Sequence, residues 1–199
     1  IIEVSCGIED NNVKDIDKEL VFDKISRFTA SKLGIPIATK IIITQEDYSR
    51  QPFYGLNQLP SFLSPFSDHL IYELKFLKTY LNNYLKENLN LNNRRDYWIH
   101  DGIQMLVMMQ YLDTYYPNLK MTGTIANLKI LKSYHFINLS FNEQYSYLYM
   151  LMARKNLDQA LNEPKNDLIK FNEQIASKYR AGLSFKYLDS YLENNIVQN

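Results

Sequence analysis

Cysteine is nearly absent from this sequence, which contains one such residue, Cys6, among 199. A single thiol excludes an internal disulfide and a thiolate-based metal site. Net charge is absent as well, because 22 basic side chains balance 22 acidic ones. Such a chain has no general basic field to attract nucleic acid or anionic lipid, so we expect no nucleic-acid partner. No apolar run approaches the roughly 20 residues that span a bilayer, which predicts no membrane insertion.

Length and aromatic content set the expected core. A chain of 199 residues can bury one good core, which predicts one domain or a domain with a small subdomain. Its 16 tyrosines and 10 phenylalanines favour dense packing of aromatic rings. The sequence opens at Ile1, in what reads as a strand, so we expect a piece of a longer or processed protein with flanking domains.

The first part of the chain predicts a strand, a helix and a second strand. Residues 1–4 and 40–44 are short and rich in β-branched side chains, as strands are. Between them, residues 16–33 follow the helical period, and the linker Gly34-Ile35-Pro36 ends that helix. We expect this helix to bury Leu20, Val21, Ile25, Phe28 and Leu33.

The rest of the chain is expected to be irregular and then helical. Residues 48–65, rich in proline, glycine and aromatics, predict an ordered but irregular segment. Asp68 is a suitable N-cap for a helix whose apolar stripe consists of Leu70, Leu74, Leu77, Leu81 and Leu85. Four further helices are predicted at 101–115, 142–160, 167–178 and 183–192. The fold class is therefore mainly α with a small N-terminal α/β portion, and we divide the chain into subdomains 1–66 and 67–199.

Two short segments carry the most specific pattern. Lys78-Thr79-Tyr80-Leu81-Asn82 is followed, after eighteen residues, by Asp101 within Trp98-Ile99-His100-Asp101-Gly102. This spacing resembles that of the aminopeptidase N-like gluzincins, zinc peptidases with an HExxH helix and a later carboxylate ligand. Three more segments follow the order of that family's motifs: Tyr54–Gln58 its GAMEN strand, Tyr145 the tyrosine of Y-x-K-G, and Tyr179–Leu183 its F-x-x-G-L motif. The resemblance covers most of the chain and implies a thermolysin-like catalytic-domain architecture.

The resemblance assigns family roles to positions whose chemistry has changed. Lys78 and Asn82 stand at the two zinc histidines, Asp101 at the third ligand and Thr79 at the glutamate that acts as general base. A charged lysine has no lone pair for a metal. A threonine hydroxyl does not accept a proton from water near pH 7. Only Asp101 keeps a metal-binding group, and Tyr145, at the oxyanion-donor position, performs no hydrolysis without a metal or nucleophile.

The GAMEN-like segment implies a substrate-binding edge formed by Tyr54, Gly55, Asn57 and Gln58. The acidic residue that holds the substrate's amino terminus in the family falls on Asn57 or Gln58, and both are neutral amides. We therefore predict a catalytically degenerate peptidase-like domain without a cofactor, which binds a peptide or a protein partner or serves structurally. Families of this kind are often exported, so the resemblance implies an exported or periplasmic location.

Other interpretations stay open at this point. Lys78 and Asn82 fit the solvated face of their helix, opposite the leucines, and Asp101 fits a helix start, where its charge suits the N-terminal dipole. The alternative function is an active metallopeptidase in which His69 and Glu73, one turn apart, share a metal with Asp101. Zinc is the cofactor in that alternative only.

Overall fold

The computed structural model describes residues 3–9, 13–37, 40–50, 64–92, 94–127 and 138–192 of the chain. These residues are mainly helical, with two short strands near the N-terminus, as the sequence predicts. The chain forms two compact units, of which the first comprises Ile1–Asn88 and Thr122–Asn138, and the second Leu89–Met121 and Leu139–Asn199. Helix α3 (Asp68–Asn88), which follows the division predicted after residue 66, belongs to the first unit.

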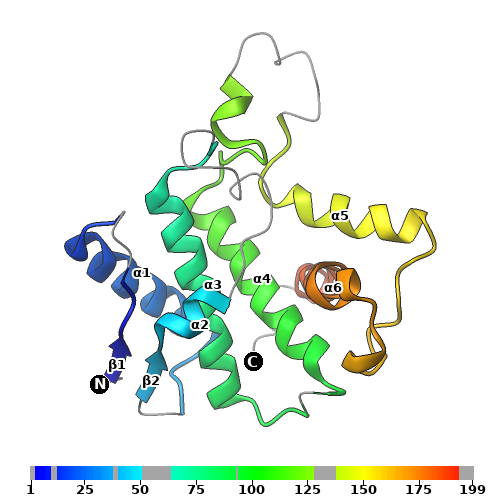
Figure 1. Cartoon of the computed structure of the whole chain (residues 1–199), viewed down its shortest axis with the longest axis horizontal. Coiled ribbons are helices and arrows are strands. Elements are labelled where there is room, and N and C mark those ends of the chain that lie inside the picture. The colour runs from blue at the N-terminus through cyan, green and yellow to red at the C-terminus, as the bar shows by residue number, and fades with distance from the viewer. Residues whose placement is uncertain are drawn as a thin grey trace. The chain divides into compact units, whose positions relative to one another are not determined.

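A β-α-β arrangement opens the first unit. Strand β1 (Glu3–Cys6) pairs in parallel with β2 (Lys40–Ile43), from Glu3 opposite Lys40 to Cys6 opposite Ile43 (Figure 1). Parallel neighbours need a crossover connection, and helix α1 (Asp15–Leu33) supplies it. The predicted strand, helix and strand are therefore confirmed.

Helix α1 ends where the sequence predicts. Gly34 has a φ of 84°, and its backbone N–H donates to the carbonyl of Ala30 at 3.0 Å. Glycine adopts this conformation without the steric penalty of a side chain. Val21, Ile25 and Phe28 are buried as expected. The expectation that Leu20 is buried is wrong, because Leu20 lies about 100° around the helix from Val21 and is 64% exposed.

Helix α3 buries its predicted leucine stripe. Its 21 residues contain no glycine or proline, which favours an uninterrupted helix. The prediction of Asp68 as N-cap is wrong, since Asp68 is the first helical residue and the hydroxyl of Ser67 accepts a hydrogen bond from the N–H of Leu70 at 3.3 Å. The buried leucines of the stripe are Leu70, Leu74, Leu77, Leu81 and Leu85.

A second stripe of α3 is aromatic, and its rings are Tyr72, Phe76, Tyr80 and Tyr84. Successive ring centroids lie 5.9, 6.4 and 6.3 Å apart. Phe22 of α1 packs edge-on against Phe76 at 6.2 Å, and Tyr48 of α2 (Gln45–Arg50) lies 5.9 Å from Tyr72. Helix α3 is therefore the central helix of the first unit, and the expected dense aromatic packing is confirmed there.

A later piece of the chain completes the first unit. The short 3₁₀ helix η3 (Gly123–Asn127) follows the turn at Thr122, and the N–H of Thr124 donates to the carbonyl of Pro65 at 2.9 Å. Gly123 has a φ of 56°, and a Cβ there would lie 2.3 Å from the same Pro65 oxygen. Glycine is required at this position both for its conformation and for the close approach.

The second unit is built from α4 (Tyr97–Tyr115), α5 (Glu143–Arg154) and α6 (Ser177–Tyr191) (Figure 1). A 3₁₀ helix, η6 (Lys165–Asp167), lies between α5 and α6. Among the described residues of the chain, no helix combines the length and the hydrophobicity that crossing a membrane requires.

Two glycines allow α4 and α6 to approach closely. A Cβ added to Gly102 would lie 2.3 Å from the ring of Phe185, and one added to Gly182 would lie 2.4 Å from the Cβ of Met105. Trp98 stacks on Phe185, with 5.9 Å between the ring centroids and 12° between the ring planes. Both glycines therefore have a packing role within this unit.

The structure corrects the start of α4 and the end of α5. Helix α4 begins at Tyr97, one turn before Asp101, so the interpretation of Asp101 as a helix start is wrong. Helix α5 ends at Arg154 rather than at residue 160. Asn156 takes a φ of 53°, which asparagine tolerates better than most residues and which stops the helix.

The two helices predicted at 167–178 and 183–192 are one helical run over residues 170–191. This run contains the π-helical turn η7 (Asn172–Ala176) directly before α6. The predicted break between residues 178 and 183 is wrong, since the helix continues through Gly182, where the missing side chain makes room for Met105.

Candidate functional site

The three motif positions of α3 lie in the first unit and are engaged in helix contacts. Thr79, at the general-base position, is fully buried, and its hydroxyl donates to the carbonyl of Lys75 at 2.8 Å. Lys78 and Asn82 are half-buried, so neither is fully on the solvated face of the helix. The side-chain amide of Asn82 donates to the Oδ1 of Asn83 at 3.2 Å.

Asp101 lies inside the second unit, on the face of α4 that meets α6. Its carboxylate is buried, and its Oδ1 lies 3.6 Å from the Nζ of Lys178 and 3.5 Å from the Nδ1 of His100. Burial raises the pKa of Asp101, but the Lys178 ammonium and the contact with His100 outweigh it, so the pKa lies below its usual value. Asp101 is therefore ionised and paired with a cation of its own unit.

Tyr145, the expected oxyanion donor, is a core residue of the second unit. Its side chain is 5% exposed, and its ring meets that of Tyr179 edge-on at 4.8 Å. Burial raises its pKa far above the usual range for a tyrosine, and the neighbouring Tyr179 adds to this shift. A hydroxyl in this position has little contact with solvent from which a substrate would approach.

The alternative metal ligands His69 and Glu73 do lie together on α3. The Nδ1 of His69 is 3.7 Å from the Oε2 of Glu73. The other oxygen of Glu73, Oε1, accepts a hydrogen bond of 2.6 Å from the Nζ of Lys24 on α1. Glu73 is only 1% exposed, so this carboxylate is a buried partner of a lysine. Asp101, the third member of the alternative set, belongs to the second unit.

The donor chemistry of these positions does not fit zinc. An ammonium at Lys78 repels a cation, the hydroxyl of Thr79 is committed to the helix backbone, and Glu73 and Asp101 already hold lysines. Within the described parts of the chain, no group of three histidine, cysteine, aspartate or glutamate side chains is arranged to hold a metal ion. We therefore derive no catalytic step through zinc.

The expected substrate-binding edge, Tyr54, Gly55, Asn57 and Gln58, lies outside the described residues. Its role stays a prediction from the sequence.

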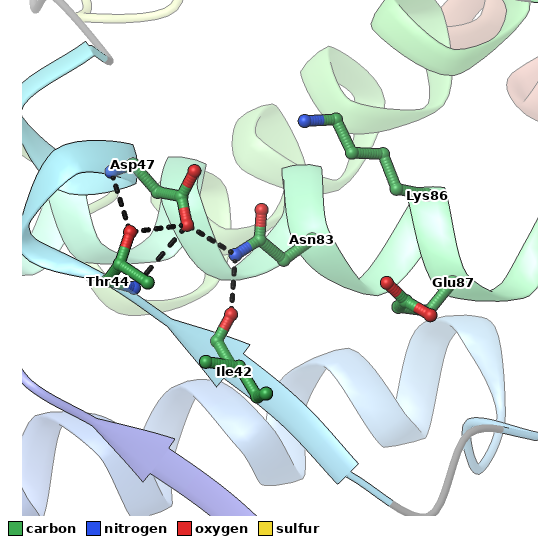
Figure 2. A pocket seen from close by; sticks show the side chains of 6 residues that line it. All are labelled: Ile42, Thr44, Asp47, Asn83, Lys86 and Glu87. Atoms are coloured by element: carbon green, nitrogen blue, oxygen red, sulfur yellow. Dashed lines mark hydrogen bonds between the residues drawn. The ribbon is translucent and has the colours of Figure 1, made fainter.

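A pocket of about 420 Å³ lies in the first unit where β2 leads into α2, alongside α3 (Figure 2). Mixed charges characterise it, with two carboxylates and one lysine, and it contains no histidine, cysteine or serine. Its lining residues are Ile42, Thr44, Asp47, Asn83, Lys86 and Glu87. The described residues that line this pocket offer polar and charged groups but no nucleophile paired with a base.

Hydrogen bonds fix one wall of this pocket. The hydroxyl of Thr44 donates to the Oδ2 of Asp47 at 2.8 Å, and the N–H of Asp47 donates to the Thr44 Oγ1 at 3.1 Å (Figure 2). The N–H of Thr44 in turn donates to the Oδ2 of Asp47 at 3.4 Å, so Thr44 and Asp47 form a capping box at the start of α2. Asn83 of α3 donates to the carbonyl of Ile42 at 2.8 Å and to Asp47 at 3.4 Å. The pocket wall is therefore part of the contact between α2, β2 and α3.

The hydrogen bond from Thr44 lowers the pKa of Asp47 below its usual value, although partial burial opposes this effect. Asn83 and the positive charge of Lys86 lower it further. Sequence reasoning missed this pocket. The signal was a Thr-x-x-Asp pattern at residues 44–47, which begins at the last residue of a predicted strand and is typical of a capping box.

Comparisons of the chain with protein-family models, with curated proteins and with solved structures found no match.

Proposed function

We propose that this chain is a catalytically degenerate, peptidase-like domain of a longer protein, which binds a peptide or protein partner or serves structurally. The mainly helical chain with a small β-α-β portion is compatible with the thermolysin-like architecture that the motifs imply. In this proposal the motif residues maintain the two helical units and take no part in hydrolysis.

The environment of Thr79 is the observation that carries this proposal. A general base must reach the water molecule that attacks the substrate. Thr79 has no exposed surface, its hydroxyl is bonded to the backbone of its own helix, and its alcohol group does not act as a base near neutral pH. The position that would need the most exposed and most basic group in a zinc peptidase therefore holds a buried, neutral one.

Metal analysis combined with an aminopeptidase assay tests the proposal. The purified chain, prepared without chelators, is expected to contain no stoichiometric zinc and to leave amino-acid anilides uncleaved, with or without added Zn²⁺. Cleavage that a chelator abolishes would overturn the proposal. In that event the variants His69→Ala and Glu73→Gln would decide whether the alternative ligands carry the activity, because both remove a donor of that set.

The proposed peptide-binding edge needs its own test. Peptide libraries with free or acetylated amino termini can be screened for binding to the intact chain and to a Tyr54→Ala variant. We expect binding that does not depend on a free amino terminus, because Asn57 and Gln58 carry no charge, and weaker binding by the variant. Equal affinity of both proteins for every peptide that binds would exclude this edge and leave the structural role.

A further inference from the structure

The carboxylate of Asp101 lies in a largely dry position and needs a partner that compensates for the lost water. Asp101 is 8% exposed and lies on the face of α4 that packs against α6, where Lys178 approaches it. An ionised carboxylate is costly to bury unless a positive charge or several hydrogen bonds compensate for the lost water. In a zinc peptidase the metal would supply that charge at this motif position.

Lysine supplies the charge here. The Nζ of Lys178 lies 3.6 Å from Asp101 Oδ1, and the lysine side chain is itself only 24% exposed. Lys178 stands on α6, one turn before Gly182, so the same helix contact that needs the glycine also places the ammonium beside Asp101. His100 lies 3.5 Å from the same oxygen and adds a polar partner from α4.

We propose that Lys178 is the permanent counter-cation of Asp101 and occupies the electrostatic role that a metal ion has at this motif position. This inference rests on the proposed function, and it names what replaced the metal at the third ligand. A divalent ion bound to Asp101 would approach to about 2 Å from the carboxylate oxygen. It would then lie close to the Lys178 ammonium, and the repulsion between the two cations would oppose binding.

The first unit contains an independent example of the same arrangement. Glu73, 1% exposed on α3, holds the Nζ of Lys24 on α1 at 2.6 Å, with His69 on its own helix 3.7 Å from its second oxygen. In each unit a buried carboxylate on one helix is thus neutralised by a lysine from another helix. Both buried carboxylates therefore have a lysine partner within their own unit.

A double-mutant cycle on the intact chain tests the pairing. The variants are Asp101→Asn, Lys178→Met and the double variant, and urea unfolding gives the equilibrium constant of each. Lys178→Met should lower the folding equilibrium constant roughly tenfold or more, because it leaves Asp101 buried without its cation. The double variant should be at least as stable as Lys178→Met alone, and Lys178→Arg should retain most of the stability.

A matched control comes from the same two helices. Lys186 of α6 and Asp113 of α4 form an ion pair of 2.9 Å whose side chains are 43% and 55% exposed. The corresponding Asp113→Asn and Lys186→Met cycle should show a coupling close to zero, since exposed pairs contribute little. Additive effects in the Asp101 cycle, or a coupling no larger than this control, would overturn the inference.

Zinc titration of the same proteins separates this inference from the proposed function. Excess Zn²⁺ should leave the urea midpoint of the unmodified chain, and that of Asp101→Asn, each unchanged from its value without zinc. Stabilisation of the unmodified chain that Asp101→Asn abolishes would show that Asp101 binds metal despite Lys178 and would overturn the inference. If the chain hydrolyses amino-acid anilides and Asp101→Asn does not change that activity, the proposed function alone is refuted. If the chain is inactive and the double-mutant cycle shows no coupling between Asp101 and Lys178, this inference alone is refuted.

Discussion

Met105 of α4 lies directly against Gly182 of α6, so that a Cβ on the glycine would be 2.4 Å from the Cβ of Met105. Gly102 meets the ring of Phe185 in the same way at 2.3 Å. These contacts explain why glycine occupies positions 102 and 182, and the explanation does not depend on any catalytic role. The helix pair depends on the absence of two side chains.

The variant Gly182→Ala tests this packing through the sign of the change in the free energy of unfolding. In an isolated helix, alanine would stabilise the helical conformation by roughly 0.5–1 kcal/mol relative to glycine. Here the added methyl group has to displace Met105, and overpacking typically costs about 1–3 kcal/mol. We expect a net decrease in the free energy of unfolding, measured with urea. Gly7→Ala is the control, since a Cβ there meets no atom within 4 Å, and a stabilised Gly182→Ala variant would contradict the packing argument.

Lys24→Met should destabilise the first unit through Glu73. The lysine donates a 2.6 Å hydrogen bond to a carboxylate that is 1% exposed, and losing a charged partner of a buried group costs about 1–3 kcal/mol. Thermal and urea unfolding both measure this loss. Arg27→Met provides the comparison on the same helix, because Arg27 pairs with Asp23 where both side chains are more than half exposed. Equal losses for the two variants would mean that burial of Glu73 does not matter.

The lowered pKa of Asp47 predicts a loss of folding stability at acidic pH. Its pKa in the folded chain is lowered, chiefly by the hydrogen bond from the Thr44 hydroxyl, from an ordinary value of 3.8. A lowered pKa means that the ionised carboxylate contributes stability above pH 3.8, and that this contribution is lost as the pH falls through the folded-state pKa. The difference in unfolding free energy between the unmodified chain and Asp47→Asn should therefore decrease between pH 6 and the acid limit, as measured by urea unfolding at each pH.

Thr44→Val is the matched control for this pH dependence. It removes the main cause of the lowered pKa and one side of the capping box while leaving the carboxylate in place. The acid-side loss of stability should be smaller in this variant than in the unmodified chain. An identical pH profile would show that Thr44 does not control Asp47.

Features that depend on local spacing were predictable from the sequence. The leucine stripe of α3 follows from residues three and four positions apart, and the end of α1 follows from Gly34, whose positive φ no other residue adopts as easily. The burial of Glu73 can also be predicted from the sequence, because Glu73 lies three residues after Leu70 and four before Leu77 on the same stripe. Its partner Lys24 lies 49 residues away on α1, and the spacing of residues along α3 does not predict this pairing.

Features that depend on contacts between distant segments were not predictable. The sequence predicts two helices on either side of residues 179–182, and it does not show that Gly182 lies against Met105 within one continuous helix. Asp101 looks like a helix start until the preceding residues Tyr97 and Trp98 are seen to be helical. The pairing of Asp101 with Lys178 joins residues on two different helices, and no periodic pattern in either helix indicates it.

The order in which the chain visits the two units limits how the protein can be divided. The chain passes between them at residues 88/89, 121/122 and 138/139, so neither unit is one continuous stretch of sequence. A fragment ending at residue 88 would lose Gly123 and Thr124, whose close approach to Pro65 completes the first unit. Neither unit can therefore be removed or exchanged as one continuous segment. A design that separates the two units has to cut the chain at all three of these points.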